Sequence, residues 1–316
     1  VVTNCTAEFW SSCQAGATKA AKEFDVDLDF RQPKTLDTAE QKNVIDAVTR
    51  VGVAGVAVSV INPDEQTPYL KRLAGQTNLL AMDNDAPESG RLCYIGIDNY
   101  EAGKAVGRMI QQALPAGGTV ALFIGGTSSA NAKARIGGVL DQLAGEKGAK
   151  GPETYGKYTL YNAGPLTDGT DESKAKANAG GVLEQLKDKP NVALVGLYAY
   201  NPKAILEAYR SKRESLKHPV TIVGFDEDWA TLKGIEDGDI RGTVVQDPFQ
   251  YGYKSVEILA ALARGDKSKA KDEPIPYRVV TKDGGPDETV NGIAVKNLKA
   301  AEFAAKLRAD LASVAK

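Results

Sequence analysis

Histidine and cysteine are scarce in this sequence, and neither sign of charge prevails. The 316 residues include one histidine and three cysteines, and 39 Lys and Arg nearly balance 41 Asp and Glu, giving a formal net charge of −2. Without a basic excess we predict no nucleic-acid partner. His218 lies in a polar stretch before a strand and has no obvious triad partner, which argues against triad catalysis. Cys5, Cys13 and Cys93 are odd in number and lack metal-ligand spacing, so we expect free, buried thiols.

Long hydrophobic runs are missing as well. The best of them, residues 51–61, stops well short of a membrane span. The chain opens with Val1-Val2-Thr3-Asn4, a pattern typical of the end of a buried strand. We therefore expect further residues upstream of Val1, an export signal being one candidate.

Motifs for cofactors, metals and nucleophilic catalysis are also absent. Gly125-Gly126-Thr127 lies between a strand and a helix, but the sequence has neither Gly-x-Gly-x-x-Gly nor Gly-Lys-Ser/Thr there. No serine stands in a nucleophile elbow. Asp83 and Asp85 flank Asn84 without further clustered ligands, which is poor support for a metal. We predict no cofactor, no metal and no catalysis.

What the sequence does contain is a repeated alternation of strand and helix. Apolar or β-branched runs cover residues 26–30, 53–60, 79–82, 93–97, 119–124, 158–161, 193–197, 221–225 and 242–245, with further short strands at 276–280 and 290–295. Amphipathic stretches cover residues 10–24, 38–50, 99–114, 130–143, 171–186, 202–210, 228–236, 251–264 and 298–315. This pattern predicts an α/β fold of parallel sheets flanked by helices, and the strand count favours two sheets.

Polar side chains follow several of these strands. Asp83, Asn84 and Asp85 follow one strand, Tyr200 and Asn201 another, and Asp226 and Gln246 each end one; Phe9 with Trp10 and the helical Arg135 complete the set. Ligands of open parallel sheets bind beyond the carboxyl ends of the strands. Carboxylates, carboxamides and a guanidinium can pair with hydroxyl groups, and aromatic rings can cover C–H faces, so this set suits a sugar.

A structural role is the alternative for some of these residues. Helix capping is the better interpretation of Asp98 and Asp228, whereas for Phe9 and Trp10 core packing and ligand contact are equally supported. If residues 83–85 are extended, Asp83 and Asp85 share one side and can reach one cleft.

These residues also resemble a known family. The chain resembles the sugar-binding proteins of bacterial ABC importers, in the ribose- and galactose-binding group. The segments that carry the resemblance, in this order, are Phe9-Trp10, Ala81 to Ala86, Arg135 to Gly138, Tyr200-Asn201, Val223 to Asp226 and Val245-Gln246. The resemblance implies a type I periplasmic binding protein: two Rossmann-like lobes joined by a hinge that the chain crosses three times, near 98–99, 245–247 and 277–280. Residues 1–98 and 247–278 would form one lobe, and 99–246 and 279–316 the other, with the place of the last helix open.

The resemblance further implies a function. Phe9, Trp10, Asp83, Arg135, Asn201, Asp226 and Gln246 match ligand-contacting positions, whereas Asn84 stands where ribose binders have Arg, which argues against ribose. We expect a monomeric, periplasmic or otherwise extracytoplasmic protein that captures a pentose or hexose for a membrane ABC permease, with a lipid anchor left open. The alternatives are the effector domain of a sugar-responsive repressor, a sensor, and an NAD-dependent enzyme.

Overall fold

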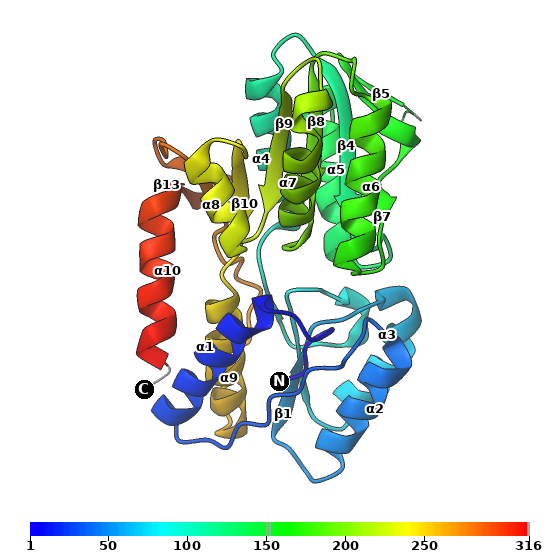
Figure 1. Cartoon of the computed structure of the whole chain (residues 1–316). Coiled ribbons are helices and arrows are strands. Elements are labelled where there is room, and N and C mark those ends of the chain that lie inside the picture. The colour runs from blue at the N-terminus through cyan, green and yellow to red at the C-terminus, as the bar shows by residue number, and fades with distance from the viewer. Residues whose placement is uncertain (150, 152, 315–316) are drawn as a thin grey trace.

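The computed structural model describes residues 1–149, 151 and 153–314, and these form two sheets one above the other in Figure 1. The first sheet has the order β1-β2-β3 and is parallel throughout; its strands are β1 (Gly55–Val58), β2 (Asn78–Met82) and β3 (Tyr94–Ile95). Val2 joins this sheet through isolated parallel bridges to Val58 and Arg31. Its helices are α1 (Phe9–Glu23), α2 (Thr38–Thr49), α3 (Pro63–Ala74) and, from much later in the chain, α9 (Pro248–Ala263).

The second sheet is larger and mixed. Its order is β12-β13-β11-β10-β9-β8-β4-β6-β5, with β7 paired to β4. Its central strands are parallel: β4 (Gly118–Ile124), β8 (Val192–Gly196), β9 (Val220–Phe225) and β10 (Gly242–Val245). The others are β5 (Thr154–Tyr155), β6 (Tyr158–Leu160), β7 (Leu166–Thr167), β11 (Arg278–Thr281), β12 (Glu288–Val290) and β13 (Ile293–Lys299).

Six helices accompany the second sheet among the described residues. They are α4 (Asn99–Ala113), α5 (Ala130–Ala144), α6 (Glu172–Gln185), α7 (Asn201–Lys212), α8 (Trp229–Asp237) and α10 (Ala300–Val314). Asp98 caps α4 by accepting from Tyr100 and Glu101 N–H, and Asp228 caps α8 in the same way, so both are capping residues as predicted. The alternation of strands and helices gives the predicted α/β class.

Close backbone contact joins α9 to α1. A Cβ added at Gly252 would lie 1.9 Å from the Cys13 carbonyl oxygen, and one at Gly16 would lie 1.9 Å from the Phe249 carbonyl oxygen. Each helix thus uses a glycine where the other approaches. This packing holds the segment that follows β10 beside the first sheet (Figure 1).

Several expected elements were wrong. Residues 26–30 form no strand, and only the neighbouring Arg31 pairs, with Val2. The strand expected at 290–295 is a hairpin of β12 and β13, because Asn291 and Gly292 both take positive φ and turn the chain. Helix α3 and the two-residue strands β5 and β7 were not predicted at all.

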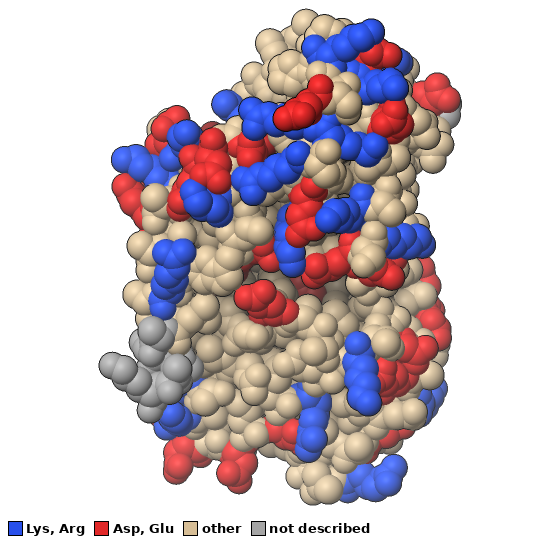
Figure 2. All heavy atoms as spheres, in the orientation of Figure 1, with Lys and Arg blue, Asp and Glu red and all other residues tan. Residues whose placement is uncertain are grey.

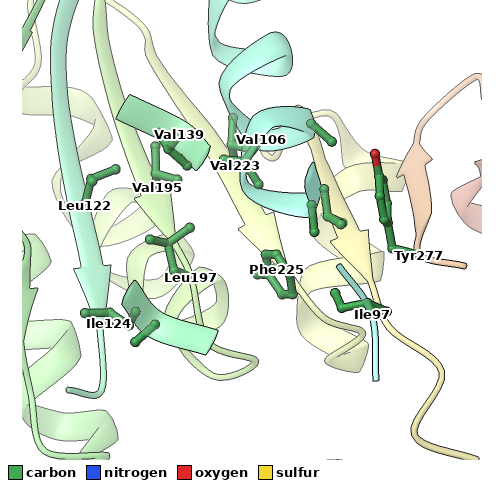
Figure 3. Packing of buried hydrophobic residues seen from close by; sticks show 14 of the residues in the cluster. Ile97, Val106, Leu122, Ile124, Val139, Val195, Leu197, Val223, Phe225 and Tyr277 are labelled. Carbon is green, nitrogen blue, oxygen red and sulfur yellow. The ribbon is translucent and has the colours of Figure 1, made fainter. Parts of the chain in front are cut away.

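The largest hydrophobic cluster reaches the edge of the second sheet that faces the first. Leu197 and Phe225, at the carboxyl ends of β8 and β9, belong to it with Ile97 and Tyr277, from two of the segments that pass between the sheets (Figure 3). Cys13 and Cys93 are buried and Cys5 is half-buried, and all three are free, while His218 is exposed. The buried apolar residues hold the ends of these strands in place, and the polar residues follow directly after them.

Candidate functional site

Asp83 follows the last residue of β2 and turns the chain out of the sheet. Its φ is 59°, a left-handed value that few side chains other than Asn and Asp adopt readily. The conformation is held by its own backbone, since Asp83 N–H donates to the Ile95 carbonyl at 2.9 Å and its carbonyl accepts from the Tyr94 hydroxyl at 2.8 Å. Oδ2 of the buried carboxylate accepts from the Ser59 hydroxyl at 2.9 Å.

Asp226 has the equivalent place at the end of β9, in the second sheet. Its φ is 67°, and Asp226 N–H donates to the Val244 carbonyl at 2.7 Å. Oδ1 of the carboxylate accepts from Gln246 Nε2 at 2.8 Å, and Gln246 Oε1 in turn accepts from the Tyr251 hydroxyl at 2.9 Å. Gln246 therefore links the carboxylate of the second sheet to α9, which packs beside the first.

Arg135 of α5 is buried, with 2% of its surface exposed. Nε donates to Asn99 Oδ1 at 2.9 Å and Nη1 to the Leu197 carbonyl at 2.9 Å, while the guanidinium lies 3.8 Å from the centre of the Phe225 ring. Nη2 is buried and has no partner among the described residues. A buried donor without a partner is costly, which makes Nη2 a candidate donor to a bound ligand.

The carboxylates of Asp83 and Asp226 interact electrostatically with the guanidinium of Arg135, and this interaction affects the pKa values of both aspartates. Burial raises the pKa of Asp83 to about 6, Arg135 and the Ser59 hydroxyl oppose this rise, and the charge of Asp226 adds to it. Burial also raises the pKa of Asp226, again against Arg135 and the hydrogen bond from Gln246. The structure thus brings together Asp83, Arg135, Asp226 and Gln246, contributed by both sheets.

The predicted aromatic pair has two different environments. Trp10 is buried in the main hydrophobic cluster, and its Nε1 donates to Asn4 Oδ1 at 3.2 Å. Phe9 is half-buried and meets the Trp10 ring edge-on at 4.9 Å between centroids. Core packing therefore accounts for Trp10, and Phe9 is the more open of the two rings.

Asp85 does not join Asp83, and the expectation that both reach one cleft was wrong. The left-handed turn at Asp83 breaks the alternation of an extended chain. Asp85 instead forms a bidentate pair with Arg91, at 2.5 Å from Nε and 2.7 Å from Nη2. Arg91 also pairs with Asp272 at 2.8 Å, so this group ties the end of the first sheet to the segment after α9.

Asn201 is fully buried and its carboxamide already has partners within the protein. Nδ2 donates to Asp168 Oδ2 at 2.9 Å, and Oδ1 accepts from the Tyr198 N–H at 3.1 Å. Tyr200 also donates to Asp168, through its hydroxyl. Asp168, 2% exposed, is a residue that sequence reasoning missed. It directly follows β7, so recognition of that two-residue strand would have found it.

Acidic side chains gather across the middle of the face shown in Figure 2, between the upper and lower parts of the molecule. Two contacts on α5 bridge the same boundary. Asn131 N–H donates to Asn84 Oδ1 at 3.2 Å, and Lys133 pairs with Asp64 at 3.0 Å. The sheets therefore approach each other over the site, in a closed arrangement.

Comparison with known families agrees with this geometry. The model of the periplasmic binding protein domain matches residues 1–267, and the chain belongs to that family. The ribose import binding protein RbsB of Escherichia coli is 26% identical over 286 residues, which cover 89% of each chain. The xylose/arabinose-binding protein XylF of Sulfolobus acidocaldarius is 26% identical and covers 78% of this chain and 61% of its own.

Solved structures give the same result. An ABC transporter solute-binding protein from Burkholderia graminis, in complex with D-arabinose, superposes with a TM-score of 0.80 at 26% identity, over 89% of this chain and 94% of its own. GanP, a glucose-galactose binding protein from Geobacillus stearothermophilus, has a TM-score of 0.78 at 23% identity, over 90% and 98% of the two chains, and shares the fold.

These findings confirm the predicted family and fold class. They also confirm a solute-binding protein of the ABC import type rather than an enzyme, since the relatives are transport proteins. Membership of this family places the protein outside the cytoplasm. In the part of the chain that the structure describes, no helix is long and apolar enough to cross a bilayer.

Proposed function

We propose that this protein captures one pentose or hexose between its two sheets and delivers it to an ABC permease in the membrane. The observation that supports this most is the set of Asp83, Arg135 and Asp226: Arg135 Nη2 is buried without a partner among the described residues, and both buried carboxylates interact electrostatically with Arg135. Sugar hydroxyls can donate to the carboxylates and accept from Nη2 at the same time. RbsB is a ribose import binding protein, and the relative from Burkholderia graminis holds D-arabinose, which agrees with this chemistry.

Binding is coupled to hinge motion in this proposal. The first lobe consists of residues 1–98 with 247–277 and the second of residues 99–246 with 278–314, because β11, which begins at Arg278, belongs to the second sheet. Phe9 and Asp83 meet the sugar first, and Arg135, Asn201 and Asp226 then close over it. Contacts to both lobes exist only in the closed form, so the ligand shifts the hinge equilibrium toward closure. The protein acts as a monomer and has no nucleic-acid partner.

Isothermal titration calorimetry with D-arabinose, D-xylose, D-ribose, D-galactose, D-glucose and D-fucose tests the proposal. At least one sugar is expected to bind. Asp226→Ala and Arg135→Ala should each weaken that binding by more than ~1.5 kcal/mol, because each removes a charged hydrogen-bonding partner. Asp188→Ala is the matched control, since Asp188 pairs with Lys217 at the surface. No binding by any sugar, or unchanged affinity in both site variants, would contradict the proposal.

A further inference from the structure

Asn84 occupies an unusual place for a residue expected to contact ligand. It is 2% exposed, and both ends of its carboxamide already have partners. Nδ2 lies 3.4 Å from Asp83 Oδ2 in its own sheet, and Oδ1 accepts the Asn131 N–H from α5, beside the other sheet. The side chain thus joins the two halves of the site directly.

The partner of Asn84 is one of the free amides at the start of a helix. The first N–H groups of a helix have no carbonyl partner within it and need a capping acceptor. Ser129 is the N-cap of α5, and its hydroxyl accepts from the Ala132 N–H at 3.4 Å. The neighbouring Asn131 N–H is left to Asn84. The cap of α5 is therefore divided between two sheets, one acceptor from each.

This divided cap exists only while the sheets are together. In an open form water would satisfy both the Asn131 N–H and the Asn84 oxygen, whereas in the closed form each satisfies the other. Helix α5 also carries Arg135, one turn further along. The contact therefore fixes the start of the helix that delivers the buried guanidinium to Asp83 and Asp226.

A second contact on α5 crosses the same boundary but differs in environment. Lys133 and Asp64 pair at 3.0 Å, yet their side chains are 53% and 81% exposed. An ion pair so open to solvent contributes little. The buried Asn84 contact is the stronger of the two links.

We propose that Asn84 is a positioning residue for closure: it caps α5 across the lobe boundary and makes no direct contact with the sugar. The inference rests on the proposed function, because closure matters only if a ligand is held there. It assigns Asn84 a role other than the direct ligand contact expected from its position after Asp83. Its consequence is that Asn84 sets the affinity for every ligand equally and contributes nothing to the choice among them.

The test compares wild type, Asn84→Ala and the control Asp64→Ala over the sugar panel, with dissociation rates from stopped-flow fluorescence. Loss of one buried hydrogen bond should weaken binding about three- to tenfold. The factor should be the same for every sugar that the wild type binds, and it should appear in the dissociation rate. Asp64→Ala should change affinity less than twofold. Asn84→Ser replaces Asn84→Ala if that variant does not fold.

Two results would overturn the inference. Factors that differ severalfold from one sugar to another would make Asn84 a ligand contact. Unchanged affinities for all sugars would show that the contact does not favour closure. A wild type that binds no sugar contradicts the proposed function instead, so the two failures are distinguishable.

Discussion

Replacing Asp83 by Asn should stabilise the closed protein while it impairs sugar binding. The carboxylate is buried, and its pKa rises from 3.8 to about 6, so keeping it ionised at neutral pH costs roughly 3 kcal/mol. Asn removes that charge and tolerates the φ of 59°. The hydrogen bond from Ser59 becomes a neutral one, and this weakening is already included in the net rise of the Asp83 pKa. The net gain in the closed form is therefore at most about 3 kcal/mol at pH 7.5.

The sign of the pH dependence follows from the same shift. The folded pKa of Asp83 lies above its unfolded value, so the folded chain binds a proton more tightly between pH 4 and 6. The cost is complete above about pH 6 and disappears as pH falls toward 4, and the advantage of Asp83→Asn should disappear with it. The gain can appear as stability or as closure, and each is measured at pH 7.5 and 4.5. Urea unfolding measures the stability, and the radius of gyration from small-angle X-ray scattering measures the closure.

The buried Asp83 carboxylate does not carry this cost if Asp83→Asn changes neither the urea midpoint nor the radius of gyration at pH 7.5, or if its effects at the two pH values are equal. Calorimetry completes the test. Asn cannot offer the same anionic acceptor to a hydroxyl, so the affinity for sugar should fall at least tenfold. Asp188→Asn at the surface should alter none of these measurements.

Two further predictions concern the framework of the site. Gly252→Ala should destabilise the protein by more than about 2 kcal/mol in urea unfolding, because its Cβ would meet the Cys13 carbonyl. The control Gly181→Ala, in α6 with open space around it, should stabilise the protein by about 0.5–1 kcal/mol. Similar effects of the two variants would contradict the packing of α9 on α1. Asp168→Ala should lower the free energy of unfolding by about 1–3 kcal/mol and weaken sugar binding, because it leaves the donors of Tyr200 and Asn201 without their acceptor. Unchanged stability and affinity would contradict the role of Asp168 as the acceptor that holds these two side chains.

Much of the site was predictable because parallel strands end at a common edge. Asp83 and Asp226 each directly follow a strand whose apolar residues are evident in the sequence, and Gln246 follows the next one. The rule needs only the strand ends, and it places each of the three at the carboxyl edge of its own sheet, where the structure has them. Arg135 lies in a helix, where that rule does not apply, and its partners Asn99 and Leu197 come from distant segments.

The failures have particular physical causes. The pairing of Asp83 with Asp85 assumed an extended backbone, but one left-handed residue reverses the alternation. Asp168 escaped notice because two residues, Leu166 and Thr167, are too few to show a strand pattern. Two of the missed elements do have sequence signals: Asn291-Gly292 is typical of a hairpin turn, and Asn62 followed by Pro63 is typical of the start of a helix.

The two left-handed aspartates suggest how the site achieves affinity. Such conformations cost about 1–3 kcal/mol each and persist only where the surroundings hold them. Here each is held within its own half: Asp83 by Tyr94 and the Ile95 carbonyl, and Asp226 by the Val244 carbonyl and by Thr243, whose hydroxyl donates to the Asp226 carbonyl at 2.9 Å. Because folding has already ordered both carboxylates, a sugar need not order them when it binds. Its binding energy then goes chiefly into drawing the halves together, the step in which Asn84 and α5 meet.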